Sequence, residues 1–231
     1  MVDPGSNPGL IELAAEVSAC RSCPRLVAWR EQVAVEKRAS YRTEVYWGRG
    51  IAGFGDPRAS IVVLGLAPAA HGANRTGRVF TGDRSGDWLF RAMHRAGLAN
   101  QPTSVSLGDG LELSGAWVTA AVKCAPPGNQ PLPIERDACR GFLTREFAML
   151  DGARVVVCLG AFGYEAACVQ FGVRPRPRFG HLIEVPAVGP RGPVTLVCSF
   201  HPSQQNTFTG RLTEPMLDAV FARAVTLAAS G

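Results

Sequence analysis

The chain has 231 residues, of which 46% are hydrophobic and 19% charged, and its formal net charge is +5. A chain of this size and apolar content can bury a substantial core, which excludes an intrinsically disordered protein and fits a single domain. Its apolar runs are too short for a membrane span of ~18 residues, so no membrane partner is expected. The polar segment 1–9 lacks the apolar centre of a secretory signal, and we expect a cytoplasmic protein.

Positive charge is concentrated between Arg21 and Arg49, where seven basic residues stand against three acidic ones. Taken alone, such a segment indicates a solvated helix face. The net charge permits a polyanionic partner without establishing one. Because only Lys37 and Lys123 are lysines, arginine carries nearly all of the positive charge, and arginine suits phosphate contacts.

Segments of helix and strand type alternate along the chain. Residues 1–8 are interpreted as a flexible tail and residues 9–231 as one domain. Short, uncharged, β-branched runs predict four buried strands, at 60–66, 116–122, 155–160 and 194–198. Helices are predicted at 10–19, 26–35, 88–98, 134–150, 161–171 and 214–227. This alternation predicts an α/β fold with a parallel sheet covered on both faces, whose ligands bind at the carboxyl ends of the strands.

Four of the seven cysteines have a spacing that indicates a metal site. Cys20 and Cys23 form a C-x-x-C pair, whereas Cys124 and Cys139 are much further apart in sequence. The wide second spacing weakens a zinc interpretation and favours a four-thiolate iron–sulfur cluster that joins two distant segments. Ordinary buried thiols are the alternative. The other three, Cys158, Cys168 and Cys198, lie in apolar segments and are interpreted as core residues.

A glycine-rich loop, residues 65–83, follows the first predicted strand. Its glycines allow backbone N–H groups to approach an anion or a flat ligand. Phe80 could stack on a planar ring, although the residue type alone favours a place in the core. His71 is either a surface or core histidine or a catalyst, and Asp83 could cap the helix that follows.

The segment Phe200-His201-Pro202-Ser203-Gln204-Gln205-Asn206 follows the last predicted strand. A histidine at the carboxyl end of a strand is well placed to donate a hydrogen bond to an anion. Ser203 could be only a capping hydroxyl. The amides after it suit either a groove or solvent.

Together these segments resemble the uracil-DNA glycosylase superfamily, and most of all its iron–sulfur branch, family 5 (UDGb type). The resemblance rests on the 65–83 loop, the segment 123–129 (Lys-Cys-Ala-Pro-Pro-Gly-Asn), the His201-Pro202-Ser203 loop and the four cysteines. It implies a three-layer α/β/α sandwich with a central four-stranded parallel sheet. It also implies a [4Fe-4S] cluster on Cys20, Cys23, Cys124 and Cys139, and removal of uracil and other deaminated bases, such as hypoxanthine, from DNA.

On this resemblance we expect a role for each candidate residue. His201 would donate to the oxyanion that develops on the base, and Asp83 would orient water or stabilise the cationic sugar. The expected base-binding residues are Phe80, Asn129, Gly65, Ala67, His71 and Asn74. The expected DNA-binding residues are Ser203, Gln204, Gln205, Asn206, Arg75, Arg78 and Arg211. Double-stranded DNA is the first candidate partner and single-stranded DNA the second, for a monomer associated with a prokaryotic nucleoid.

One departure from the wider superfamily concerns water activation. Related families have a polar residue early in the first loop, whereas Leu66 and Ala67 stand here, as is typical of family 5. Two other functions stay open at this point: a non-catalytic iron–sulfur module that binds nucleic acid, and a redox enzyme that uses the cluster. Incubating uracil-containing duplex with the protein, and then adding alkali to cleave abasic sites, distinguishes the three.

Overall fold

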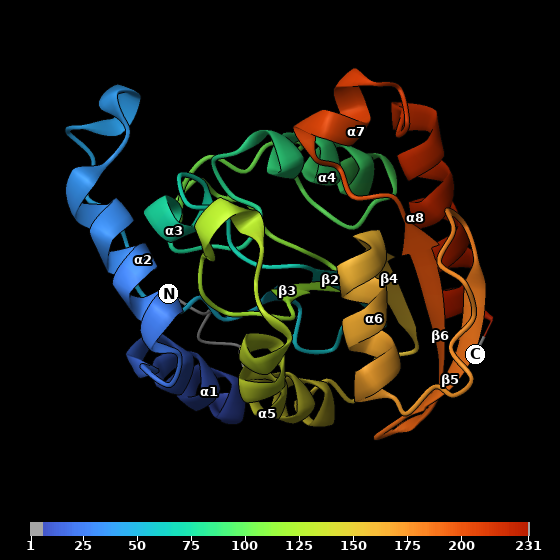
Figure 1. The fold of residues 1–231 in the computed structure, drawn as a ribbon. Coiled ribbons are helices and arrows are strands. Elements are labelled where there is room, and N and C mark those ends of the chain that lie inside the picture. Colours follow the sequence, from blue (N-terminus) through green and yellow to red (C-terminus); the bar gives the residue numbers. More distant parts are fainter. Residues whose placement is uncertain (1–6, 231) are drawn as a thin grey trace.

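A single sheet forms the middle layer of the protein, as Figure 1 shows for the computed structural model, which describes residues 7–230. The sheet has six strands in the order β1-β3-β2-β4-β6-β5. Their bounds are β1 Phe54–Gly55, β2 Ile61–Gly65, β3 Ala116–Ala120, β4 Val155–Leu159, β5 Glu184–Gly189 and β6 Gly192–Ser199. The four inner strands are mutually parallel. The predicted α/β fold with a central four-stranded parallel sheet is therefore confirmed.

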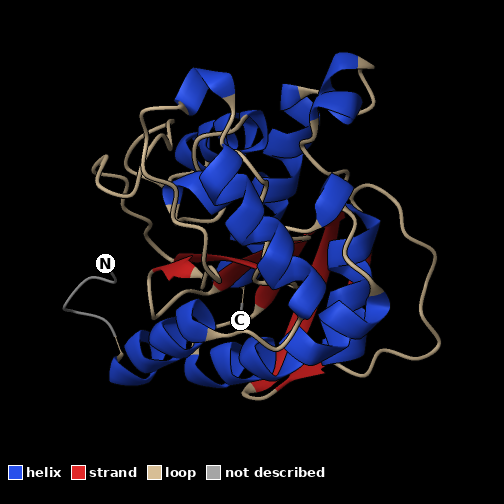
Figure 2. Cartoon of the chain, turned by 60° about the vertical axis from the view of Figure 1, so that its left-hand side comes forward, coloured by secondary structure: helices blue, strands red, loops and turns tan. Residues whose placement is uncertain are grey.

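The inner strands form because their residues are apolar on both faces. Every residue of β2, β3 and β4 is buried, as a parallel sheet with helices on both sides requires. Val62 pairs in register with Trp117 on one side and with Val156 on the other. The strands thus run through the middle of the molecule with helices on either side (Figure 2).

Helices cover the two faces of the sheet as separate layers. The longer ones are α1 Pro8–Ala19, α2 Pro24–Glu36, α4 Arg84–Arg95, α5 Pro133–Met149, α6 Gly160–Gln170 and α8 Glu214–Ala229. Short helical turns are η1 Ala39–Tyr41, α3 Ala73–Thr76, η2 Pro127–Asn129 and α7 Gln204–Phe208. Helices α4 and α8 pack against one face, with Phe90 and Phe221 in that core. Helices α1, α5 and α6 pack against the other, with Phe147 and Tyr164 in theirs.

The sheet also has two edge strands that the sequence did not predict. Strand β1 pairs antiparallel with β3, and β5 pairs antiparallel with β6. Both were missed because β1 is only two residues long and because β5 alternates exposed and buried residues around Pro186. A proline is tolerated at such an edge because no ladder hydrogen bond is required of it.

The predicted helices and core cysteines are confirmed, with boundaries that shift by a few residues. The largest shift is at α4, which begins at Arg84 rather than Trp88 because Asp83 caps it. Cys158, Cys168 and Cys198 are buried. The predicted tail falls mostly on residues 1–6, outside the described residues, while Asn7 already caps α1 and Pro8 is its first residue. Among the described helices, none is long and apolar enough to cross a membrane.

Candidate active site

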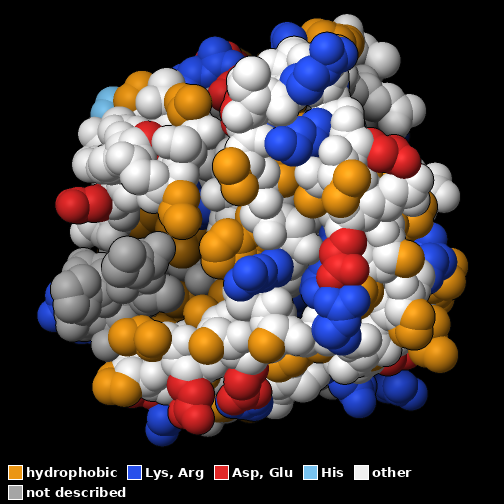
Figure 3. Space-filling model, turned by 90° about the vertical axis from the view of Figure 1, so that its left-hand side faces the viewer, with side chains coloured by type: hydrophobic (Ala, Val, Ile, Leu, Met, Phe, Trp, Pro, Cys, Tyr) orange, Lys and Arg blue, Asp and Glu red, His pale blue; other side chains and the backbone are white. Residues whose placement is uncertain are grey.

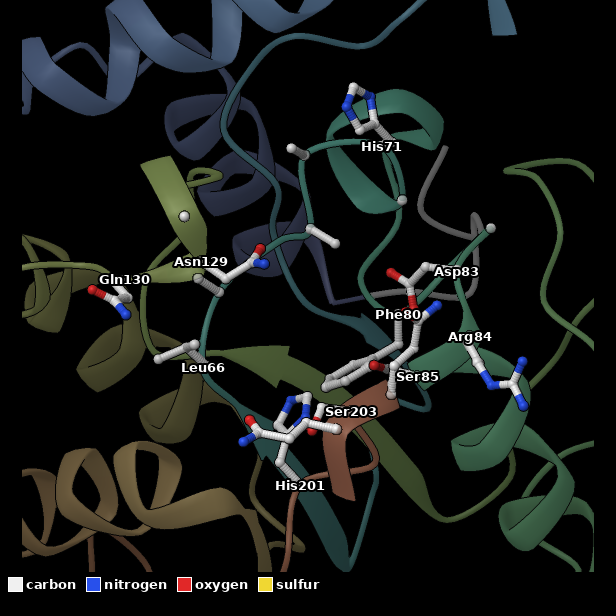
Figure 4. Close-up of a pocket in the computed structure, with 18 of the residues that line it drawn as sticks. Leu66, His71, Phe80, Asp83, Arg84, Ser85, Asn129, Gln130, His201 and Ser203 are labelled. Carbon is white, nitrogen blue, oxygen red and sulfur yellow. The ribbon is translucent and has the colours of Figure 1, made fainter. Parts of the chain in front are cut away.

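A cleft of about 800 Å³ lies at the carboxyl ends of the inner strands. It is lined by the loops that follow β2, β3 and β6, and by residues near η1. In Figure 4, Phe80, Asp83 and Ser85 lie on one side of the cleft, Leu66 and Asn129 on the other, and His201 and Ser203 below them. This volume is within the usual range for small-ligand sites. The cleft therefore lies where an open α/β sheet binds its ligands.

Phe80 forms a wall of the cleft and is held there by the strand beneath it. It is 8% exposed and has a positive φ of 53°, which is unusual for a bulky residue. A Cβ atom at Gly65 would lie 2.6 Å from Cζ of Phe80, so only glycine leaves room for the ring. The ring centroids of Phe80 and His201 are 6.0 Å apart and tilted by 33°. Gly65 does not line the cleft, and it acts through Phe80.

His201 is fixed at the base of the cleft by its neighbours. The Asn206 side-chain amide donates a hydrogen bond to the His201 carbonyl over 2.9 Å, and Ser203 caps α7. Gly160, with a φ of 80°, leaves only just enough room for the His201 side chain. Burial lowers the pKa of His201 to about 4. The imidazole is therefore neutral near pH 7 and donates from one N–H only.

Asp83 lies across the cleft at the N-terminus of α4. Its carboxylate accepts a hydrogen bond from Gly86 N over 3.0 Å and packs against Gly72, where no Cβ would fit. Burial raises the pKa of Asp83, whereas the hydrogen bonds from Gly86 and Ser85 oppose that rise. The predicted capping role is confirmed. Asp83 also lines the cleft (Figure 4).

The remaining base-binding candidates differ in their placement. Ala67, His71 and Asn129 all line the cleft. His71 Nδ1 lies 3.1 Å from the Tyr46 hydroxyl, and burial together with Arg38 and Arg75 lowers its pKa. Asn129 is exposed, with a φ of 56°. Asn74 does not reach the cleft: it is fully buried, and its amide donates to the Arg30 carbonyl over 3.1 Å.

Two of the arginines expected on DNA are instead used inside the protein. Arg75 is ion-paired with Glu44 and donates to the Gly82 carbonyl over 3.0 Å. Arg78 is buried, and its guanidinium contacts both carboxylate oxygens of Asp109 at 2.8 Å. A guanidinium enclosed in this way cannot also reach a phosphate. Arg211 is exposed, and its guanidinium lies 4.7 Å from the ring centroid of Phe200.

Sequence reasoning missed several residues that line the cleft. Arg84 and Ser85 directly follow Asp83, and Arg38 and Tyr41 come from the segment near η1. The signal for Arg38 in the sequence is the local excess of basic residues, which by itself indicates a solvated helix face. That interpretation holds for part of the segment, because acidic side chains lie beside basic ones on the face that carries α1 and α2 (Figure 3). Arg21 there is ion-paired with Glu31.

The four predicted ligand cysteines come together from three segments of the chain. Cys23, Cys124 and Cys139 pack in one small cluster with Leu26 and Val122. Cys20 lies close enough for its charge to raise the pKa of Cys124, although burial is the larger cause. Within residues 7–230, no group of three or more His, Cys, Asp or Glu side chains is arranged to hold a metal ion. Together, Cys20, Cys23, Cys124 and Cys139 form a thiol cluster.

Comparison with known proteins gives one consistent result. Residues 52–224 match the uracil DNA glycosylase superfamily. The chain is 52% identical over 227 residues to the type-5 uracil-DNA glycosylase of Mycobacterium tuberculosis, covering 97% of this chain and 84% of that protein. It is 50% identical over 213 residues to the protein of the same description from Thermus thermophilus, covering 92% and 95%. For the one from Pyrobaculum aerophilum, identity is 44% over 205 residues, covering 89% and 87%.

Proposed function

The chain belongs to the type-5 uracil-DNA glycosylases of the uracil DNA glycosylase superfamily, and we propose that it hydrolyses the bond between uracil and deoxyribose in DNA. The C1′–N1 bond breaks, water supplies the oxygen at C1′, and the products are free uracil and an abasic site. The observation that carries this proposal is the opposition of His201 and Asp83 across one cleft beside Phe80. The target nucleotide must leave the stack to enter it, which costs a few kcal/mol.

Departure of the base leaves negative charge on the ring and positive charge on the sugar. His201 is neutral at the working pH and donates its N–H to the base oxygen where the negative charge grows. Burial makes this interaction stronger than it would be in water. A neutral donor also leaves the departing base as an anion and does not have to protonate it.

Asp83 is the acid placed to act on the other reactant. Its carboxylate faces the cleft from the end of α4, where it can orient the attacking water and stabilise the oxocarbenium-like sugar. Neither Leu66 nor Ala67, which line the opposite wall, can do this. We therefore assign water positioning to Asp83.

Phe80 and Asn129 supply the contacts that hold the base. The Phe80 ring provides a flat apolar face for stacking, and the Asn129 amide can pair with polar edges of either donor or acceptor type. The cleft of about 800 Å³ also has room for a bicyclic base. On this ground we extend the proposal to other deaminated bases, hypoxanthine first among them.

The DNA backbone needs cations that are not already paired. Arg38 and Arg84 both line the cleft, are exposed, and form no ion pair among the described residues. The Arg84 guanidinium lies 4.3 Å from the ring centroid of Phe208, which fixes its direction. With Arg211 and the amides of Gln204 and Gln205, these arginines take the place of Arg75 and Arg78 in our assignment of phosphate contacts.

We also propose that the thiol cluster holds an iron–sulfur cluster. A single zinc ion needs all of its ligands around one point, and the wide spacing of Cys124 and Cys139 in the sequence weakens that interpretation. In a four-iron cluster the thiolates are spread over separate irons, which fits ligands drawn from the segment between α1 and α2, the segment after β3, and α5. Arg30 supports an anionic group here, because Nη1 of this buried arginine lies 2.9 Å from Cys124 Sγ. The cluster would tie three segments together, and hydrolysis requires no electron from it.

A strand-cleavage assay tests the activity. Duplex containing one uracil is incubated with protein and then treated with alkali, and a matched duplex with thymine serves as the control. Cleavage of the uracil strand alone, without added reductant, is the expected result. A hypoxanthine duplex tests the extension to other bases. Binding without cleavage of any deaminated base would overturn the proposal.

A further inference from the structure

Arg30 is a buried cation without a carboxylate partner. It is 1% exposed, and it forms no ion pair with Asp or Glu within the described part of the chain. Its guanidinium donates to Cys124 Sγ and to the Cys20 carbonyl, each over 2.9 Å, and Nε has no partner. Burying an unpaired charge is strongly destabilising. The guanidinium therefore needs an anion, and among the described residues its hydrogen bonds go only to Cys20 and Cys124 of the thiol cluster.

The same residue is tied to the wall of the cleft through its backbone. The buried Asn74 side chain donates to the Arg30 carbonyl over 3.1 Å, and the Asn74 carbonyl accepts from Gly48 N over 3.1 Å. Asn74 belongs to α3, inside the loop that carries His71 and Asp83. Asn74 thus connects α2 to this loop by a buried hydrogen bond.

Arg75 connects α3 to the end of the loop that precedes Asp83. Its guanidinium donates to the His71 carbonyl over 2.9 Å and to the Gly82 carbonyl over 3.0 Å. Gly82 directly precedes Asp83. A continuous series of contacts therefore runs from Cys124 through Arg30, Asn74 and Arg75 to the residue beside Asp83.

We propose that Arg30 is the counter-charge of the iron–sulfur cluster and that, with Asn74, it transmits the cluster's position to the 69–83 wall of the cleft. In this role the cluster positions the loop that holds Asp83. Arg30 and Asn74 are positioning residues that touch neither base nor sugar. The inference rests on the proposed cluster, so its test reads the cluster and the loop separately from activity.

The first measurement is the reduction potential of the cluster in purified protein. Removing a positive charge in contact with a ligand sulfur disfavours the added electron, so Arg30→Gln should weaken electron affinity at least tenfold, a shift of about 59 mV to more negative potential. Arg21→Gln is the matched control, because Arg21 lies between two ligand cysteines but is exposed and paired with Glu31. Arg30→Lys and Asn74→Leu keep the charge and should stay close to wild type.

The second measurement is hydrogen exchange of residues 69–83. Exchange there should be at least tenfold faster in Asn74→Leu and in Arg30→Gln, while the strand β4 in the core is unchanged. Wild-type protein without iron would overturn the cluster itself. An Arg30→Gln protein that contains iron and keeps both the wild-type potential and wild-type exchange would overturn only the inference about Arg30. If Arg30→Gln does not fold, Asn74→Leu decides: unchanged exchange in the loop overturns the proposed link.

Discussion

Gly65 and the Phe80 ring lie so close together that one additional carbon atom at Gly65 would not fit. A Cβ atom at Gly65 would lie 2.6 Å from Cζ and 2.7 Å from Cε2 of Phe80, below the distance that non-bonded carbons tolerate. The end of β2 therefore decides where the aromatic wall of the cleft lies. Phe80, in turn, is 6.0 Å from His201 between ring centroids. The stacking proposed for Phe80 and the hydrogen-bond donation proposed for His201 therefore both depend on this glycine.

Gly65→Ala should displace the Phe80 ring and slow uracil excision by about 10²-fold, the scale expected for misplacing a reacting group by ~1 Å. Single-turnover rates on a uracil duplex measure this. Gly108→Ala is the control, because a Cβ there meets nothing within 4 Å. Equal rates for the two variants would show that the ring position is irrelevant to catalysis.

His201→Ala should slow excision by roughly 10²-fold or more, the loss expected for one oxyanion donor. Because burial lowers the pKa of His201 to about 4, the wild-type rate should show no inflection near the ordinary histidine pKa of about 6.5. A rate profile from pH 5.5 to 8 checks this. An inflection near pH 6.5 that disappears in His201→Ala would contradict a neutral donor.

Asp83→Asn keeps the shape of the N-cap and removes the charge. If the carboxylate acts on water or sugar, the chemical step should fall by about 10²-fold or more with unchanged DNA affinity. Burial raises the pKa of Asp83. Protonation of this carboxylate should therefore begin to reduce the wild-type rate at a pH above the ordinary pKa of aspartate. The rate of Asp83→Asn should show no such decrease at acid pH. Near-normal rates in Asp83→Asn, with loss of stability only in Asp83→Ala, would leave the residue as a cap.

Arg38→Gln and Arg84→Gln should each weaken binding to duplex DNA and reduce the slope of log K against log salt by about 0.9, one phosphate contact apiece. Titrations at several salt concentrations measure the slope. Arg154→Gln serves as the control, because Arg154 is exposed and forms no ion pair among the described residues. It directly precedes β4, so it lies at the amino end of that strand, and the cleft lies at the carboxyl ends of the strands. Slopes identical to wild type would place the phosphates elsewhere.

Cys124→Ser should lose iron and solubility together, because Cys124 is one of the four proposed ligands. Cys198→Ser should keep its iron, since Cys198 lies in β6 and belongs to the core. Iron analysis of both proteins, purified without oxygen, is the measurement, and about four irons per chain are expected for a four-iron cluster. Stoichiometric zinc in place of iron would contradict the cluster.

The sequence by itself determined the layered core and the location of the site. Strands such as β2 and β4 were predictable because a run of buried β-branched residues depends on local pattern alone. Their order along the chain then placed the functional loops at one edge of the sheet. These loops contain His201, Phe80 and Asp83, whose roles in the site were expected only from the resemblance to the uracil-DNA glycosylases.

Only the tertiary structure decided which polar side chains face the cleft. Arg75 and Arg78 stand in a loop of the right composition, but Glu44 and Asp109, each about thirty residues away along the chain, take up their charge. Asn74 turns inward to Arg30, and Arg38 reaches the cleft from a distant segment. A side chain's partner is set by contacts between segments that local pattern does not encode. The direction of each charged group in this site was therefore decided by long-range packing.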